Sequence, residues 1–224
     1  MEKKKLVMFD FEGVIVATQH FWFRLHKSAN EGLTWEKFSE MSNGNFIEKQ
    51  KELKEKGEYN WPKNYEESFD HALSHEFSVD DILHDAILYL KDHYQMAIVS
   101  SASNKILNKF LAKENLDGCF DDVLGYEDHS SKVIKINGLL QKYNIEKNNA
   151  VLITDTLGDV REANEAGVYS SAFCAWSKSM IQYGSSAVST KPIPSNSPRF
   201  ARASSIIPQP DGFITDTRIL VFGE

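Results

Sequence analysis

The chain has 224 residues and a formal net charge of −7, with 42% hydrophobic and 25% charged residues. This ordinary globular composition excludes a wholly disordered, collagen-like or disulfide-stapled chain, and the length suits one sizeable domain or a core domain with a smaller insertion. The acidic balance argues against general binding to a nucleic-acid backbone or an anionic membrane, because both need a basic face.

The cysteines and the N-terminal stretch carry no metal or targeting signal. Cys119 and Cys174 lie far apart and outside any CxxC spacing, so they predict neither a disulfide framework nor a zinc site. The apolar run that begins at Leu6 is interrupted by Asp10 before it reaches the length of a signal-peptide core, and no run is long enough to span a bilayer. We expect a cytoplasmic protein without nucleic-acid or membrane partners, either a monomer or a homodimer.

Three short apolar runs predict buried strands at residues 6–9, 96–99 and 150–154, and each ends at acidic or hydroxyl side chains. Strands that alternate with helices predict an α/β fold in which helices cover both faces of a parallel sheet. Ligands of such sheets bind at the carboxyl ends of the strands. Gly167 is placed to end the last predicted helix. Helix-like stretches follow the second and third runs, at residues 104–114 and 159–166.

The long segment between the first two predicted strands has a different character. Residues 18–78 are rich in aromatic and charged side chains and contain no apolar run typical of a buried strand. We interpret this segment as a helical cap over the strand ends, inserted into a core made of residues 1–17 and 79–224. The apolar spacing predicts four amphipathic helices in it, at residues 21–31, 35–41, 46–56 and 65–75.

A second change of composition lies near the C-terminus. No acidic residue occurs in residues 178–210, while five of the six prolines fall there and serine is abundant. Such a segment buries too little apolar surface to offset the entropy of ordering it, so we predict a flexible loop or linker. Residues 212–216 after it could form a short returning strand.

Two acidic side chains, Asp10 and Glu12, follow the first predicted strand, and Gly13 lets the backbone turn after them. Ionised carboxylates at the edge of an apolar core are costly unless a partner offsets their charge, and a divalent cation is one such partner. Acidic residues after strands also cap helices or turns, so this pair alone does not distinguish the two interpretations.

A second acidic pair, Asp155 and Asp159, follows the third predicted strand, and Gly158 lies at the turn into the next helix. If the first and third strands are neighbours, three or four carboxylates converge above the sheet. Mg²⁺ prefers such a site, in which a few carboxylates bind the ion and water and substrate phosphate complete its shell. The spacing therefore predicts a magnesium site.

Phosphate chemistry needs two further parts, and the chain has a candidate for each. Ser100 and Ser101 end the second predicted strand just before a helix, where a hydroxyl and backbone N–H groups favour an anion. Lys132 begins a helical stretch between the second and third strands and could neutralise phosphoryl oxygens in a transition state. Taken singly, the serine could be a helix cap and the lysine a solvated side chain.

The order of these motifs resembles that of the haloacid dehalogenase (HAD) superfamily, whose members are mostly magnesium-dependent phosphatases. The resemblance covers most of residues 5–176. It implies a Rossmann-like parallel-sheet core with an inserted α-helical cap, similar to the phosphoglycolate-phosphatase-like and β-phosphoglucomutase-like branch. The four motifs that carry it are residues 10–15, residues 98–100, Lys132 and residues 153–159.

The resemblance also implies a role for each matching residue. Asp10 would attack phosphorus and form an aspartyl-phosphate, and Glu12 would act as general acid and base. The metal ligands implied for Mg²⁺ are Asp10, the backbone carbonyl of Glu12 and Asp155, with Asp159 acting directly or through water. The phosphate-binding groups implied are Ser100, the amide of Ser101, and Lys132, which would also restrain Asp10.

Glu12 departs from the family pattern, in which phosphatases usually carry aspartate at this position. Glutamate has the same chemistry but one more methylene, so its carboxylate must reach the substrate from another angle. A misplacement of about 1 Å can cost on the order of a hundredfold in rate. This departure predicts slow or specialised activity.

The function predicted from these residues is a magnesium-dependent phosphatase that hydrolyses a small phosphorylated metabolite. A phosphomutase with the same nucleophile stays open as an alternative. So does a catalytically weak phosphoryl-binding or regulatory protein, because of Glu12. Within the predicted cap, we interpret Trp22, Trp35 and Trp61 as packing residues, and His20 and Arg24 as weaker candidates for contact with the substrate.

Overall fold

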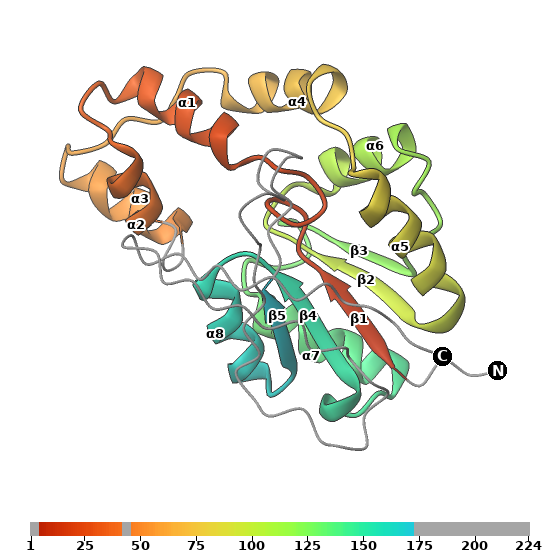
Figure 1. Cartoon of the computed structure of the whole chain (residues 1–224). Coiled ribbons are helices and arrows are strands. Elements are labelled where there is room, and N and C mark those ends of the chain that lie inside the picture. Colours follow the sequence, from red (N-terminus) through yellow and green to blue (C-terminus); the bar gives the residue numbers. More distant parts are fainter. Residues whose placement is uncertain (1–4, 42–45, 173–224) are drawn as a thin grey trace, which may run out of the picture.

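The computed structural model describes residues 5–41 and 46–172, which form a parallel five-stranded sheet with helices on both faces and a helical segment at one end (Figure 1). The predicted loop at 178–210 and the possible strand at 212–216 lie outside the described residues. The strands are β1 (Leu6–Phe9), β2 (Gln95–Val99), β3 (Asp122–Leu124), β4 (Ala150–Thr154) and β5 (Tyr169–Ala172). The helices are α1 (Gln19–Ala29), α2 (Trp35–Met41), α3 (Phe46–Glu55), α4 (Tyr65–His75), α5 (Asp81–His93), α6 (Asn104–Lys113), α7 (Lys132–Tyr143) and α8 (Leu157–Ala166), with a short 3-10 turn at Lys147–Asn149.

The strand order β3-β2-β1-β4-β5 puts the first strand in the centre of the sheet. The chain moves outward from β1 to β2 and β3, and then crosses to the other side of β1 to form β4 and β5. The order of the strands therefore reverses between β1 and β4, and parallel sheets bind ligands at such a switch point. Residues that directly follow β1 and β4 are thereby brought to one place.

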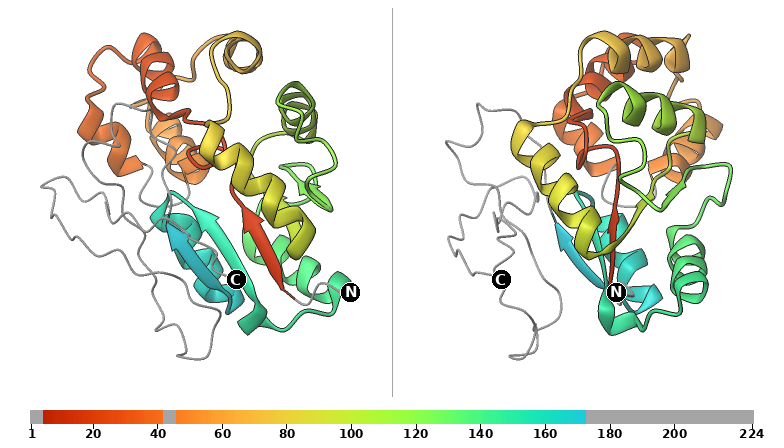
Figure 2. Two further views of the ribbon diagram at one scale, coloured as in Figure 1. Left: turned by 45° about the vertical axis from the view of Figure 1, so that its right-hand side comes forward. Right: turned by 90° about the vertical axis from the view of Figure 1, so that its right-hand side faces the viewer.

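Both faces of the sheet are buried because successive side chains of a strand point to opposite sides. In β1, Val7 and Phe9 pack into one apolar cluster, while Leu6 and Met8 pack into the other. Helices α5 and α6 cover the first face and α7 and α8 the second (Figure 2). The predicted α/β class, with a parallel sheet between helical layers, is confirmed.

Local sequence signals define the helix ends near the strand termini. The side chain of Ser103 accepts a hydrogen bond from the backbone N–H of Ile106 at the start of α6, and Thr156 does the same for Asp159 at the start of α8. Gly167 ends α8 in the left-handed conformation, as predicted. These caps fix where α6 and α8 begin, directly beyond the ends of β2 and β4.

Residues 18–78, which we call the helical segment, contain α1 to α4 and no strand within their described part. This segment lies beyond the carboxyl ends of the strands (Figures 1 and 2). It has a small apolar cluster of its own, made of Leu33, Phe38, Met41 and Tyr59. Helix α1 begins at Gln19, two residues before the predicted start, and this difference brings Gln19 into the helix.

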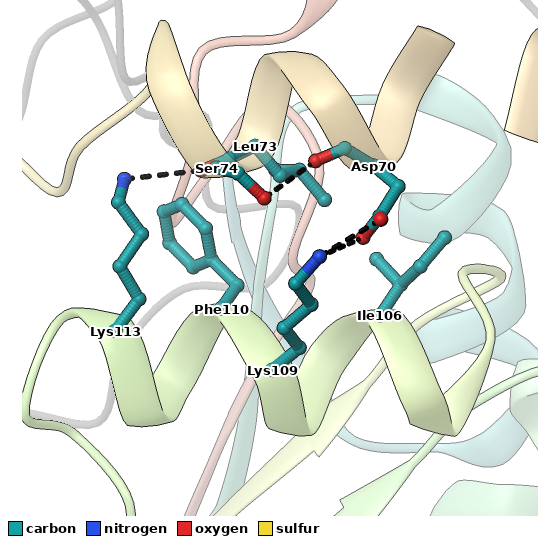
Figure 3. Close-up of a pocket in the computed structure, with 7 residues that line it drawn as sticks. All are labelled: Asp70, Leu73, Ser74, Ile106, Lys109, Phe110 and Lys113. Atoms are coloured by element: carbon teal, nitrogen blue, oxygen red, sulfur yellow. Dashed lines mark hydrogen bonds and ion pairs between the residues drawn. The ribbon is translucent and has the colours of Figure 1, made fainter. Parts of the chain in front are cut away.

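Helix α4 connects the helical segment to the apolar cluster on one face of the sheet. Phe69 and Leu73 are buried in the apolar cluster on the α5 and α6 face. The Lys109 ammonium of α6 forms an ion pair with Asp70 at 2.6 Å, and Lys113 donates a hydrogen bond to the carbonyl of Leu73 at 3.0 Å (Figure 3). The pocket drawn in Figure 3 thus lies between α4 and α6, and its two lysines are already engaged. Among the described helices, none is long and apolar enough to cross a membrane.

Candidate active site

Three carboxylates from the two sides of the switch point form one group. One oxygen from each of Asp10, Asp155 and Asp159 lies within 4.8 Å of the others. Asp10 follows β1 and its backbone N–H donates to the carbonyl of Ile153 in β4 at 2.8 Å, which aligns the two strand ends. The convergence predicted from the sequence is therefore present: these residues could bind a metal ion together.

Gly13 allows the loop after β1 to approach Asp155 closely. Its φ of +79° lies in the left-handed region, and a Cβ atom at this position would lie 1.9 Å from Oδ2 of Asp155. No other residue type fits this space without moving the carboxylate. The glycine therefore has two roles, because it permits both the turn and the position of Asp155.

Lys132 links two of the three carboxylates. Its ammonium lies 2.8 Å from Oδ2 of Asp10 and 2.8 Å from Oδ2 of Asp159, and the lysine is buried. Burial disfavours its charge, but the attraction of Asp10 and Asp159 holds its pKa above the usual range. The lysine is thus charged at every physiological pH and fixes the relative position of the two carboxylates.

The two partners of Lys132 respond in opposite ways. Burial raises the pKa of Asp10 well above its usual range against the pull of Lys132, and the negative neighbours Asp159 and Asp155 add to this rise. Burial also opposes the charge of Asp159, but Lys132 and further hydrogen bonds outweigh it and lower its pKa. One of these bonds comes from the hydroxyl of Thr154 at 2.6 Å. When all three carboxylates are ionised, their negative charge exceeds the positive charge of Lys132, and a further cation would stabilise that state.

The two carboxylate oxygens of Asp155 differ in their hydrogen bonding, and this difference bears on whether a metal fits the site. Its Oδ2 accepts a hydrogen bond from the side-chain amide of Gln19 at 2.8 Å, while its buried Oδ1 has no hydrogen-bond partner among the described residues. Burial, followed by the charge of Asp159, raises the pKa of Asp155 to about 7. A buried acceptor without a donor is costly, and a hard cation such as Mg²⁺ satisfies a carboxylate oxygen in this situation. The residues present therefore fit a divalent ion.

The Glu12 carboxylate lies outside the three-carboxylate group. Its Oε2 accepts a hydrogen bond of 2.5 Å from the indole N–H of Trp22 on α1. Burial and the nearby charge of Asp10 raise the pKa of Glu12 to about 7. A carboxyl group with such a pKa can both donate and accept a proton near neutral pH, which is what general acid–base chemistry requires.

Ser100, Ser101 and a buried lysine lie at the end of β2. Ser100 is buried and its hydroxyl accepts a hydrogen bond of 3.1 Å from the backbone N–H of Ala102, while Ser101 is exposed. The ammonium of Lys135 donates to the carbonyl of Ser100 at 2.5 Å and to that of Gly125 at 2.7 Å. Lys135 therefore ties the end of β2 to the residue that follows β3.

Lys135 gives a prediction for the pH dependence of stability. Burial, followed by the charge of Lys132, lowers the pKa of Lys135 from 10.5 to about 8. Between these values the unfolded chain binds more protons than the folded chain, so this lysine adds stability as pH rises from 8 to 10. In urea unfolding, wild type should gain free energy of unfolding relative to Lys135→Met over this range, by at most about 1.4 kcal/mol per pH unit, which is the limit for the titration of a single group.

Lys142 on the same helix is the matched control for that experiment. It is exposed, and its hydrogen bond to Asp122 raises its pKa instead of lowering it. The Lys142→Met variant should therefore show no gain of wild-type stability between pH 8 and 10. An equal pH response in both variants would contradict the assignment of the low pKa to Lys135.

The sequence profile of haloacid dehalogenase-like hydrolases matches residues 7–173, which is most of the chain. The chain belongs to this family. The HAD chain is therefore an enzyme of the hydrolase type, and the family expected from its motifs is confirmed.

Solved structures of HAD proteins share the fold at low sequence identity. A proposed phosphoglycolate phosphatase from Lactobacillus plantarum has a TM-score of 0.61 at 15% identity, over 76% of this chain and 86% of the other. A proposed β-phosphoglucomutase from Thermotoga maritima has a TM-score of 0.54 at 18% identity, over 73% and 82%. A proposed HAD hydrolase from Bacillus subtilis, bound to magnesium, has a TM-score of 0.55 at 18% identity, over 75% and 87%. At such identities the similarity establishes the fold alone, and a search of curated proteins found no match.

Two contacts from α1 were not expected from the sequence. Gln19 was not recognised as a site residue, and Trp22 was interpreted only as a packing residue, yet both donate hydrogen bonds to predicted site carboxylates. The weaker candidates on the same helix are engaged elsewhere. His20 stacks on Trp35 with ring centroids 5.0 Å apart, and Arg24 lies 3.8 Å from Glu76.

Proposed function

We propose that this HAD enzyme is a magnesium-dependent phosphatase that hydrolyses a small phosphorylated metabolite through an aspartyl-phosphate on Asp10. The observation that carries the proposal is the convergence of Asp10, Asp155 and Asp159 around Lys132 at the switch point of the sheet. We also propose that the helical segment acts as a cap over this site, and that the protein is cytoplasmic.

Asp10 is fixed for nucleophilic attack by bonds to both of its oxygens. Oδ1 accepts a hydrogen bond of 2.7 Å from the backbone N–H of Phe11, and Oδ2 is paired with Lys132. In the first step an oxygen of Asp10 bonds to phosphorus while the bond from phosphorus to the ester oxygen breaks. Glu12 gives its proton to the departing ester oxygen, which leaves as an alcohol.

The second step releases inorganic phosphate. The Glu12 carboxylate takes a proton from a water molecule as the water oxygen attacks phosphorus, and the bond between phosphorus and Asp10 breaks. Glu12 then carries the proton needed for the next turnover. The two steps use one group as acid and then as base, which a pKa of about 7 allows.

The remaining site residues bind and neutralise the phosphoryl group. We propose that Asp10, the backbone carbonyl of Glu12, Asp155 and Asp159 bind Mg²⁺, which when bound supplies positive charge to the carboxylates and phosphoryl oxygens. The Ser100 hydroxyl and the Ser101 amide would bind phosphoryl oxygens beside Lys132. Lys135, whose ammonium donates to the carbonyl of Ser100, adds a positive charge beside this group. Among the described residues, Lys135 forms no ion pair with a carboxylate.

The test uses enzyme from which metal has been removed with a chelator. It is assayed on a panel of phosphate esters before and after addition of Mg²⁺. The panel contains phosphoglycolate, sugar phosphates and nucleoside monophosphates, and includes a hexose 1-phosphate. We expect inorganic phosphate to appear with Mg²⁺ and to stop when the ion is removed. Product analysis of the hexose 1-phosphate separates hydrolysis from transfer to the sugar. Release of phosphate from no member of the panel at any Mg²⁺ concentration would contradict the proposal.

A further inference from the structure

The first turns of α1 contribute two hydrogen-bond donors to the site. Gln19 and Trp22 are three residues apart, so their side chains lie on one face of the helix. The amide of Gln19 donates to Asp155 at 2.8 Å and the indole of Trp22 donates to Glu12 at 2.5 Å. A helix of the proposed cap thus contacts both a predicted metal ligand and the predicted general acid.

The Trp22 indole is itself fixed by aromatic contacts. Its ring lies 4.6 Å from that of Phe69 on α4, 5.2 Å from Phe21 and 6.2 Å from Tyr65, measured between centroids. Phe69 is buried in the apolar cluster beneath α4. Because an indole has a single N–H, its whole donor capacity is used on Glu12, from a position that the core defines.

The length of Glu12 matches this donor. A glutamate side chain has more rotamers than an aspartate, so it needs an additional contact to point in one direction. The bond from Trp22 provides that contact to Oε2 and leaves Oε1 for proton transfer. An aspartate at this position would be one methylene shorter and would lose the bond at its observed length.

We propose that Trp22 is a positioning residue for the proton transfers of Glu12, and that the glutamate in place of the family's usual aspartate is paired with it. The proposal rests on the proposed function. When Oε1 of Glu12 gives its proton to the ester oxygen, the indole N–H stabilises the carboxylate that forms. When Glu12 takes a proton from water, the same bond keeps Oε1 directed at the site.

The test uses Trp22→Phe with two classes of substrate. An alkyl phosphate from the active members of the panel needs a proton on its leaving oxygen, whereas p-nitrophenyl phosphate has a leaving group that departs without one. The value of kcat/KM depends on the steps up to and including phosphoryl transfer to Asp10, so it reports the departure of the leaving group. We expect kcat/KM of Trp22→Phe to fall on the order of tenfold or more for the alkyl ester and much less for the aryl ester.

Trp61→Phe is the matched control, because Trp61 belongs to the same aromatic cluster and, among the described residues, donates no hydrogen bond to the site carboxylates. It removes the same atoms and should change both substrates equally. An equal loss on both substrates in Trp22→Phe, or no loss on either, would overturn the proposal while leaving the phosphatase function intact. A wild-type enzyme inactive on every ester would overturn the proposed function and this inference with it.

The Glu12→Asp background gives a second, independent measurement. If the bond is the reason for the effect, Trp22→Phe should cause no further loss on the alkyl ester once Glu12 is aspartate. Additive losses would contradict the pairing. Should Trp22→Phe fail to fold, Glu12→Asp alone carries the test, since it breaks the same bond from the other side. It should then lose activity selectively on the alkyl ester, and a gain would overturn the proposal.

Discussion

Replacement of Asp10 by asparagine is expected to abolish phosphate release, with a loss on the order of 10⁴-fold or more in kcat. The amide is nearly the same size as the carboxylate, so the loss reflects chemistry and not packing. Asparagine cannot attack phosphorus as an anion, and it removes one of the two negative partners of Lys132. The measurement is release of inorganic phosphate with Mg²⁺ on an active ester of the panel.

Asp85→Asn is the matched control for this substitution. Asp85 is exposed on α5, so its replacement by asparagine makes the same change of charge away from the site. Circular dichroism should show both variants folded, and Asp85→Asn should keep wild-type activity. Activity of Asp10→Asn equal to that of wild type would mean that another group attacks phosphorus.

Gly13→Ala is the second substitution with a large expected effect. The added Cβ would meet Oδ2 of Asp155 at 1.9 Å, so either the loop after β1 or the carboxylate must move by more than 1 Å. A displacement of this size costs on the order of a hundredfold in rate. Because Asp155 is also a predicted metal ligand, calorimetric titration should show weaker binding of Mg²⁺ as well as lower kcat/KM.

Gly118→Ala separates the collision from the backbone strain. Gly118 has the same φ of +79°, but a Cβ there would meet no atom within 4 Å. Both variants should lose about 1–2 kcal/mol of stability from the left-handed backbone. Only Gly13→Ala should lose activity and Mg²⁺ affinity. Equal activity of the two variants would contradict the account of Gly13 as a site residue.

The central part of the fold is readable from the sequence because its signals are local. The strands β1, β2 and β4 are buried on both faces, so each is a nearly continuous apolar run. The edge strands are different. Strand β3 has three half-buried residues and includes an aspartate, and β5 reads YSSA, so neither gives an apolar run that predicts a strand.

The candidate site also contains residues that could be predicted from the sequence and residues that could not. Asp10 and Asp155 follow strongly predicted strands, and their convergence depends only on β1 and β4 being neighbours. Tertiary structure brings Gln19, Trp22 and Lys135 to the site. The first two come from a helix of the helical segment, and Lys135 comes from the first turn of α7. Lys135 did carry a usable signal, since it lies three residues after Lys132 and therefore on the same helix face.

The most direct measurement of the central claim is to stop turnover with acid and to find the phosphoryl group by peptide mass spectrometry. With Mg²⁺ and an active ester, wild type should carry one phosphoryl group on the peptide that contains Asp10, at that residue. The group should be absent without Mg²⁺ and absent in Asp10→Asn. A phosphoryl group on any other residue, or an Asp10 that is never labelled while the ester is consumed, would contradict the proposed mechanism.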